Sequence, residues 1–413
     1  MCRGTVYNTN NLMRKYALAI ITLTIYNLSS AQETIIFDNQ SKVITTGVPF
    51  LLIAADARAA GMGDIGVATS VDAFSQQWNQ SKYAFSETKS GIAVSYTPYL
   101  SKLVNDIFLG NVSYFNRINE GSAFAVSFKY FSLGEIELVQ DENSSPLIAQ
   151  PNEMTIDASY ALRLGTQFSM AVGLRYLRSD LKIQALDNSA EAASSVAADI
   201  SGFYQSEEQA YDSFNGRTRL GFAIQNIGPK IKYDDAGRES FLPTTLRLGG
   251  GFDFIFDEYN TLALTGEVTK LLVPSPPVLG YVDLDGNQKQ ATDGSEPTII
   301  VEGKSQDVNF LKGMFQSFSD APGGFREELK EFTWALGAEY QYQDSFAFRA
   351  GYFNESDEKG ARKFFALGAG FKYTTINIDM SYLFSASKVQ SPLENTLRFS
   401  LTFNFGDKTY REY

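Results

Sequence analysis

Few residues in this chain have the types and spacing that enzyme chemistry requires. The sequence contains no histidine, and this removes the serine and cysteine triads and the zinc sites that depend on imidazole. Its one cysteine, Cys2, lies in an N-terminal segment that we expect to be removed, so disulfides and cysteine-bound metals are not expected. We therefore predict that the protein is not an enzyme and holds no cofactor or metal ion.

One short run, Asp283-Leu284-Asp285-Gly286-Asn287, has the look of a calcium loop. An EF-hand loop closes with a bidentate glutamate at its last ligand position, eleven residues after the first. Counted from Asp283, that position is Gly294. The favoured interpretation is an ordinary Asx turn, in which the aspartate side chain bonds its own backbone.

The elements that must position any functional residue are long alternating strands. Apolar residues alternate with polar or small ones at Phe124–Tyr130, Phe168–Tyr176 and Leu397–Phe405. Successive side chains of a strand point to opposite faces, so each strand has one apolar and one polar or small face. Strands of about 9 to 12 residues match a tilted bilayer crossing better than the usual ~5–6 of globular proteins. Tyrosines near the ends of the apolar faces fit the aromatic girdles of membrane barrels.

We predict 14 such strands and a closed, all-β transmembrane antiparallel β-barrel over residues 91–413, because closure leaves no unpaired edge in lipid. Every second link is short and the links between them are mostly longer, up to Leu271–Glu331. This alternation is typical of periplasmic turns and extracellular loops. The predicted strands are Gly91–Tyr99, Ile107–Arg117, Ser122–Ser132, Met154–Leu164, Gln167–Arg178, Ser195–Gln205, Arg217–Asn226, Thr244–Phe254, Asn260–Lys270, Phe332–Tyr342, Phe346–Phe353, Phe364–Tyr373, Thr375–Ser385 and Thr396–Phe405.

Six arginines lie on the polar faces of these strands. On the lipid side each would cost ~2–4 kcal/mol at the bilayer midplane, so we expect all six to point into the lumen. They are Arg163, Arg175, Arg219, Arg247, Arg349 and Arg398.

Residues Met1–Ala31 are predicted to be a secretory signal peptide, with Met1 or Met13 as the true start. Arg14 and Lys15 precede an apolar stretch, and Ser29-Ser30-Ala31 forms a small-residue cleavage site. About 13 apolar residues are too few for a membrane anchor, which needs ~20. Removal takes three bases and no acid, so the formal net charge goes from −12 to −15. A surface this acidic does not suit nucleic-acid binding.

The segment 32–90 does not alternate, and we interpret it as an N-terminal hatch that plugs the lumen, or as a periplasmic lid, with one short helix. Its charged residues Asp56, Arg58 and Asp64 are candidates for a salt network that holds the plug in place, and ligand contact is the alternative. Gly61 and Gly63 are not framed by a strand and a helix, as a dinucleotide site would be. We expect them to permit tight backbone turns.

The long connection Leu271–Glu331 contains a second candidate site. Six apolar residues in it have helical spacing, which indicates either packing onto the barrel rim or docking of a partner. The charged run Glu327, Glu328, Lys330 and Glu331 near its end is predicted to be solvated. The apolar residues are Val308, Phe310, Leu311, Met314, Phe315 and Phe318.

The hatch also carries a family resemblance. The runs Gly47–Asp56, Ala57–Ala68 and Gln77-Trp78-Asn79 closely resemble the N-terminal segment of the PorV family, outer-membrane proteins of the type IX protein secretion system. The wider group is the FadL-like 14-stranded barrels with an N-terminal hatch. One departure is that Gln80-Ser81 follows Asn79, where FadL-like hatches read Asn-Pro-Ala. The hatch residues that carry the resemblance are Asp56, Arg58, Gly61, Gly63, Asp64, Trp78 and Asn79.

The resemblance implies an adaptor in the outer membrane that binds exported cargo by C-terminal signal domains at the translocon and passes it to the surface attachment machinery. The implied partners are the large translocon barrel, the cargo, the attachment complex and membrane lipid or lipopolysaccharide. Leu133–Glu153 and Leu271–Glu331 are the candidate contact regions. A FadL-like transporter of fatty acids or other hydrophobic solutes is the alternative from fold alone. A lipid A deacylase is a third, against which the absence of histidine argues.

Overall fold

The computed structural model describes residues 42–101, 104–138, 147–181, 192–233, 239–282, 288–290, 299–387, 392–394 and 396–406. The predicted signal peptide, the calcium-like run Asp283–Asn287 and the C-terminal Tyr413 lie outside these residues.

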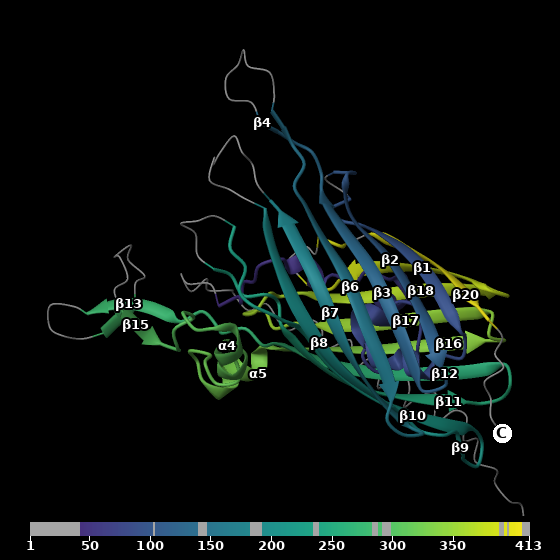
Figure 1. Cartoon of the computed structure of the whole chain (residues 1–413). Helices are drawn as coiled ribbons and strands as arrows, with labels where there is room; N and C mark the ends of the chain where they lie inside the picture. Colours follow the sequence, from purple (N-terminus) through teal and green to yellow (C-terminus); the bar gives the residue numbers. More distant parts are fainter. Residues whose placement is uncertain are drawn as a thin grey trace, which may run out of the picture. The chain divides into compact units, whose positions relative to one another are not determined.

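Fourteen long antiparallel strands form one closed sheet (Figure 1). Each strand pairs with its neighbours in sequence, and β1 pairs with β20 from Ser90↔Phe405 to Tyr96↔Phe399. That seam closes the sheet, so the prediction of a 14-stranded antiparallel barrel is confirmed. The strands are β1 (Ser90–Pro98), β2 (Ile107–Asn119), β3 (Ser122–Leu133), β6 (Asn152–Arg163), β7 (Phe168–Asp180), β8 (Ala193–Gln205), β10 (Asn215–Ile227), β11 (Thr245–Ile255), β12 (Asn260–Leu271), β16 (Phe332–Tyr342), β17 (Phe346–Asn354), β18 (Lys363–Tyr373), β19 (Ile376–Ser385) and β20 (Leu397–Phe405).

The barrel is apolar on the outside and polar or small on the inside, the reverse of a soluble protein. On β3, Phe124, Val126 and Phe128 are exposed, whereas Ala125 between them and Lys129 after them are buried. An exposed apolar face and a buried polar face are what a wall between lipid and a filled lumen needs. Among the described residues, no helix is long and apolar enough to cross a membrane.

Short turns and longer connections alternate around the barrel. The longer ones hold two small sheets, formed by β4 (Ile136–Leu138) with β5 (Leu147–Ala149), and by β13 (Val278–Val282) with β14 (Gln288–Gln290) and β15 (Ile299–Glu302). The connection from β12 to β16 also holds helices α4 (Phe310–Gln316) and α5 (Phe325–Lys330), which lie together near β13 and β15 in Figure 1. The long turn 206–214 contains a two-residue strand, β9 (Gln209–Ala210), that pairs with β10.

The hatch, residues 42–89, lies inside the lumen. It has four short helical segments where the sequence predicted one: η1 (Pro49–Leu52), α2 (Ala57–Ala60), α3 (Ser75–Trp78) and η2 (Gln80–Phe85). Segment η2 contacts strands β2, β3, β6, β7 and β8, while α2 contacts β18, β19 and β20. Contacts with opposite parts of the wall place the segment within the barrel and exclude a lid below it. Side-chain caps mark the start of two of these segments, since the Asp56 and Asn79 side chains accept hydrogen bonds from the Ala59 and Ser81 amides.

Two glycines of the wall allow the hatch backbone to approach. A Cβ on Gly351 would lie 2.0 Å from the carbonyl carbon of Met62, and one on Gly221 would lie 2.1 Å from the Val67 carbonyl oxygen. Both neighbours are main-chain atoms, which cannot rotate away as a side chain can. The fit of hatch to wall therefore depends on the absence of side chains at these two positions.

The Gly351→Ala substitution should push the hatch away from β17. We expect a loss of about 1–3 kcal/mol in the free energy of unfolding, as for other overpacked sites, and faster proteolysis of the hatch in the folded barrel. The matched control is Gly165→Ala, where a Cβ would meet nothing within 4 Å. Equal stability of the two variants would contradict the close fit.

Candidate functional site

A chain of alternating charges ties the hatch to the barrel wall. Arg58 on α2 donates two hydrogen bonds to Glu339 on β16, from Nε at 2.9 Å and from Nη2 at 2.8 Å. Its Nη1 lies 2.7 Å from Asp72 Oδ2 within the hatch. Glu339 also accepts from Arg349 on β17, and Arg349 reaches Asp379 on β19 at 2.7 Å. All five groups are buried or nearly so, and each charge has an opposite charge on at least one side.

A second set of contacts involves the hatch loop between α2 and α3. Glu267 on β12 accepts hydrogen bonds from the Gly66 and Val67 amides at 2.9 and 3.0 Å, and Arg247 on β11 pairs with its other oxygen at 2.8 Å. Arg398 on β20 lies 3.2 Å from Asp64. The wall thus supplies both an acid for backbone amides and a base for a hatch carboxylate.

Asp56, Trp78 and Asn79 make most of their hydrogen bonds within the hatch and fewer with the wall. Trp78 donates its Nε1–H to Asp56 Oδ1 at 2.7 Å, and Asp56 Oδ2 accepts the Ala59 amide. Asn79 Nδ2 bridges Val67 O in the hatch and Gly202 O on β8, at 2.8 and 3.0 Å. Asp56 makes no ion pair with Arg58 among the described residues.

The predicted hatch residues therefore lie together, but their partners were not foreseen. Asp56, Arg58 and Asp64 do not pair with each other, and the groups that neutralise the last two are Glu339 and Arg398 on the wall. The alternation along β16 could have predicted that Glu339 points into the lumen, since Glu339 lies on the same face of the strand as the buried Ala335. Gly63 adopts a φ of +85°, which favours glycine, whereas Gly61 has an ordinary helical φ and sits against Gly368 of β18.

The expectation of inward arginines is confirmed for five of the six. Arg175 pairs with Asp157 and Asp199, and Arg219 with Asp253 at 2.6 Å, while Arg247, Arg349 and Arg398 make the contacts above. Arg163 differs because it lies at the end of β6, where its exposed guanidinium stacks 4.6 Å from the Phe85 ring centroid.

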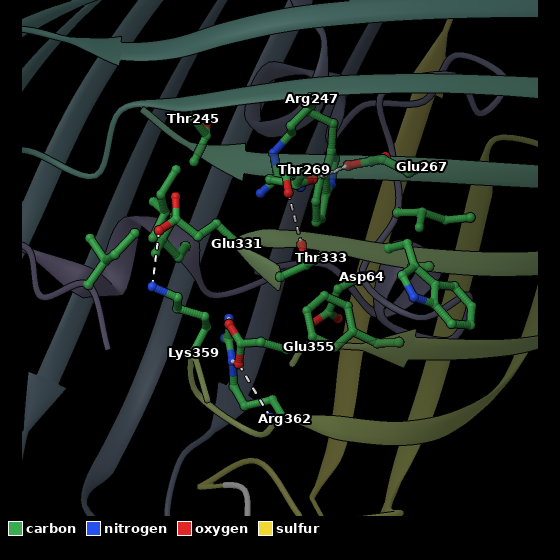
Figure 2. A pocket seen from close by; sticks show the side chains of 18 residues that line it. Asp64, Thr245, Arg247, Glu267, Thr269, Glu331, Thr333, Glu355, Lys359 and Arg362 are labelled. Carbon is green, nitrogen blue, oxygen red and sulfur yellow. Dashed lines mark hydrogen bonds and ion pairs between the residues drawn. The ribbon is translucent and has the colours of Figure 1, made fainter. Parts of the chain in front are cut away.

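A small cavity of about 80 Å³ lies between hatch and wall (Figure 2). Arg247 and Glu267 lie at one end of it, and Glu355, Lys359 and Arg362 at the other, while apolar residues such as Phe353 form much of the remaining lining. Pockets that bury drug-sized ligands occupy ~300–1,000 Å³. This cavity is suited to a few water molecules and is too small for an acyl chain.

The base of the long connection is a buried ionic cluster, which corrects the prediction of a solvated charged run. Lys270 Nζ lies 2.6 Å from Glu331 and 3.3 Å from Glu328, and Lys359 Nζ lies 2.7 Å from Glu327 and 3.0 Å from Glu331. All three glutamates are buried, and only Lys330 of the run is exposed. The prediction failed because the two lysines come from β12 and from the β17–β18 link, far away in sequence.

The same cluster is the one grouping of acids in the described residues with metal-site spacing. Carboxylate oxygens of Asp320, Glu328 and Glu331 lie within 4.8 Å of one another. The Lys270 ammonium already bonds two of these groups, so the arrangement is explained as an ion-pair network without a metal. Burial and the nearby Glu328 and Glu331 carboxylates raise the pKa of Asp320 to about 6.

Helix α4 contains the apolar residues proposed for partner docking, and they divide into two groups. Gly313 packs against Phe241 and Pro274, so one side of the helix rests on neighbouring loops. Val308, Phe310 and Met314 are half-buried there. The exposed side chains are Leu311, Phe315 and Phe318, and Phe315 has 76% of its surface accessible.

An apolar outer wall, a polar lumen and a hatch that fills this lumen define a plugged β-barrel of the outer membrane. Within that class, the sequence model "Type IX secretion system protein PorV" matches residues 36–278, more than half of the chain. The chain belongs to the PorV family, and the resemblance read from the hatch is confirmed.

Solved structures that match the chain are barrels at low sequence identity. One is a Pseudomonas aeruginosa FadL homologue, which is 13% identical and has a TM-score of 0.45, with 89% of this chain and 100% of that chain covered. Another is the Ralstonia pickettii toluene transporter TbuX, which is 12% identical and has a TM-score of 0.48, with 86% of this chain and 100% of that chain covered. The Pseudomonas putida toluene transporter TodX also matches, with 11% identity, a TM-score of 0.46, and 88% of this chain and 98% of that chain covered. Likeness at this level says nothing about what this chain binds. No curated protein sequence matches it.

The Arg58→Gln substitution should loosen the hatch. It leaves the buried Glu339 with Arg349 alone, and breaking a buried ion pair costs about 3–5 kcal/mol. Hydrogen exchange of hatch amides in the folded barrel should rise accordingly. As a control, Lys372→Gln removes the exposed pair with Asp344, where about 0–1 kcal/mol is at stake. Unchanged exchange in Arg58→Gln would show that the pair does not hold the hatch.

The Asp320→Asn substitution should stabilise the base of the long connection at neutral pH. The pKa of Asp320 is raised from 3.8 to about 6 in the folded state, so ionisation of this group lowers stability. That loss is absent below pH 4 and complete above about pH 6. Proteolysis between α4 and α5 should be slower in the variant than in the parent at pH 7.5, and equal at pH 4. Asp307→Asn, an exposed acid of the same connection, serves as the control. A pH-independent difference would refute the assignment.

Proposed function

We propose that the protein is a secretion adaptor of the type IX system. It binds exported proteins through their C-terminal signal domains at the translocon barrel and passes them to the surface attachment machinery, without catalysis. Membership of the PorV family supports a role in type IX secretion. The observation that carries the adaptor mechanism is the filled lumen, because a barrel whose interior is occupied must act through its surfaces.

The hatch is held firmly in the lumen. The hatch is fixed by buried ion pairs at Arg58 and Asp64 and by backbone contacts at two wall glycines. Opening a passage would break these pairs, leaving Glu339 with Arg349 alone and Arg398 without its acid, at a cost of several kcal/mol. A protein cargo would need a far larger passage than the 80 Å³ cavity.

The surfaces left for partners are the long connections, which we place on the extracellular side, with the short turns and the termini in the periplasm. Connection 272–331 is the largest and has structure of its own, including α4 and α5. Exposed aromatic side chains such as Phe315 are the kind that anchor protein interfaces. We therefore assign Leu311, Phe315 and Phe318 to partner contact, with the β4–β5 hairpin as a second contact region.

The structure offers less support for the two alternatives, transport of fatty acids and deacylation of lipid A, than for the adaptor. Uptake of fatty acids would need an apolar route wide enough for an acyl chain, whereas the cavity between hatch and wall occupies only about 80 Å³ and has ionisable groups such as Arg247 and Glu267 among its lining residues. For a deacylase, Lys82 is a natural candidate beside Ser81. Its Nζ instead donates to Gly66 O at 2.9 Å and Thr69 Oγ1 at 3.0 Å, and Ser81 Oγ bonds Asn79.

Deletion of the gene should remove a whole class of proteins from the cell surface and medium. The lost proteins should share a C-terminal domain and accumulate in the periplasm, as measured by mass spectrometry of each fraction. Intact secretion in the deletion strain would show that the adaptor proposal is wrong.

Complementation then tests the contact surface. The double variant Leu311→Ser with Phe315→Ser should insert normally but restore secretion poorly and recover less translocon barrel on purification. Tyr259→Ser, an exposed aromatic in a short turn at the other end of the barrel, is the matched control. Full complementation by the double variant would exclude α4 as a contact and leave the adaptor role itself standing.

A further inference from the structure

Helix α5 has three faces of different character. Its residues at four-residue spacing share a face, so Phe325 lies with Leu329 and Arg326 lies with Lys330. The first pair is exposed, with 77% of Phe325 accessible, and the second pair is exposed as well. The third face carries the glutamates, buried against Lys270 and Lys359.

The position of Lys270 shows which side of the barrel wall α5 covers. On β12, Lys270 has the same parity as Leu264 and Val268, whose side chains are exposed on the outer face. Lys270 is nevertheless fully buried, by Glu328 and Glu331 and by the Phe318 and Phe332 rings at 5.9 and 5.1 Å. On the inner side, Glu327 pairs with Lys359 and lies 3.6 Å from Lys42 of the hatch. Helix α5 therefore lies across the rim of the wall, with Glu328 toward the outer face and Glu327 toward the lumen.

The apolar face of α5 directly precedes a lipid-facing strand in the chain. One residue, Glu331, separates the end of α5 from the start of β16 at Phe332. From there Trp334 and Leu336 lie along the outer face of β16, and both are exposed. Exposed large apolar side chains are therefore present on the helix and on the strand that follows it.

The charges of this region are sorted by exposure. Between Val308 and Lys330, the acids Asp320, Glu327 and Glu328 are buried, while all three bases, Lys312, Arg326 and Lys330, are exposed. Lys330 pairs with Glu358, but Arg326 has no ion pair among the described residues. The exposed acid Asp307 directly precedes this stretch, and Glu358 is paired with Lys330, so Arg326 is the base of α5 that remains available to an external anion.

We propose that α5 rests on the phosphate head groups of the bilayer around the barrel, with Phe325 and Leu329 inserted among the lipids and Arg326 bound to lipid phosphate. Exposed apolar groups beside exposed bases are the combination that binds anionic membrane surfaces. The helix would then fix the long connection at the membrane surface. The inference depends on the position of the barrel in the membrane and is independent of the secretion role.

Tryptophan fluorescence tests this placement, since the chain has only Trp78 and Trp334. The parent is the full chain with Trp334→Phe, in which the buried Trp78 is a constant background. Phe325→Trp is added, and the protein is reconstituted in vesicles of phosphatidylcholine and phosphatidylglycerol with acyl chains brominated near the glycerol. Because such a helix sits about 5–10 Å into the head-group boundary, the added indole should lose at least about half of its fluorescence.

The controls separate contact with lipid from contact with protein or water. Val282→Trp, at an exposed position of β13 in the same connection, should keep its fluorescence, and native Trp334 should be quenched in the unmodified chain if insertion is correct. Arg326→Glu should reduce quenching at position 325 in both kinds of vesicle, because both lipids carry phosphate, and the loss should be larger in the anionic vesicles than in pure phosphatidylcholine. If position 325 is quenched no more than position 282 while Trp334 is quenched, the proposal is overturned and the face belongs to a protein partner.

Discussion

Lipid offers no hydrogen-bond partner to the backbone, and this constraint governs the whole molecule. A sheet in the bilayer must pair every strand edge, and here the last pairing, β1 with β20, joins the two ends of the barrel sequence. Closure turns one face of every strand inward, away from lipid. That face can therefore carry polar and charged residues, and the hatch occupies the space that it encloses.

Charge in the lumen is tolerated because it is shared between hatch and wall. Arg58 and Asp64 come from the hatch, whereas Glu339 and Arg398 come from strands. Each of these groups loses an opposite charge if hatch and wall separate, and burial of an unpaired charge is far more costly than burial of a pair. The shared ion pairs therefore favour one position of the hatch in the lumen, and the charged residues of the lumen have a structural role.

How much of this could be predicted from sequence depends on the range of the interaction. Alternation along a strand is local, so all 14 strands could be located, with boundaries within two residues of those in the structure. The inward direction of Arg175 or Arg349 followed from the same parity. The partner of Arg58 did not, because Glu339 is 281 residues away and only the folded register brings them together. The burial of the α5 glutamates escaped prediction for the same reason, since it depends on Lys270 and Lys359.

The seam between β1 and β20 has a consequence for biogenesis. The first barrel strand meets its final neighbour only after the remaining strands have been delivered, so the wall stays open until the C-terminal strand arrives. The hatch precedes β1 in the chain, and its backbone contacts Gly221 and Gly351, which lie on strands far apart in the sequence. The binding surface for the plug is therefore complete only once both parts of the wall are in place.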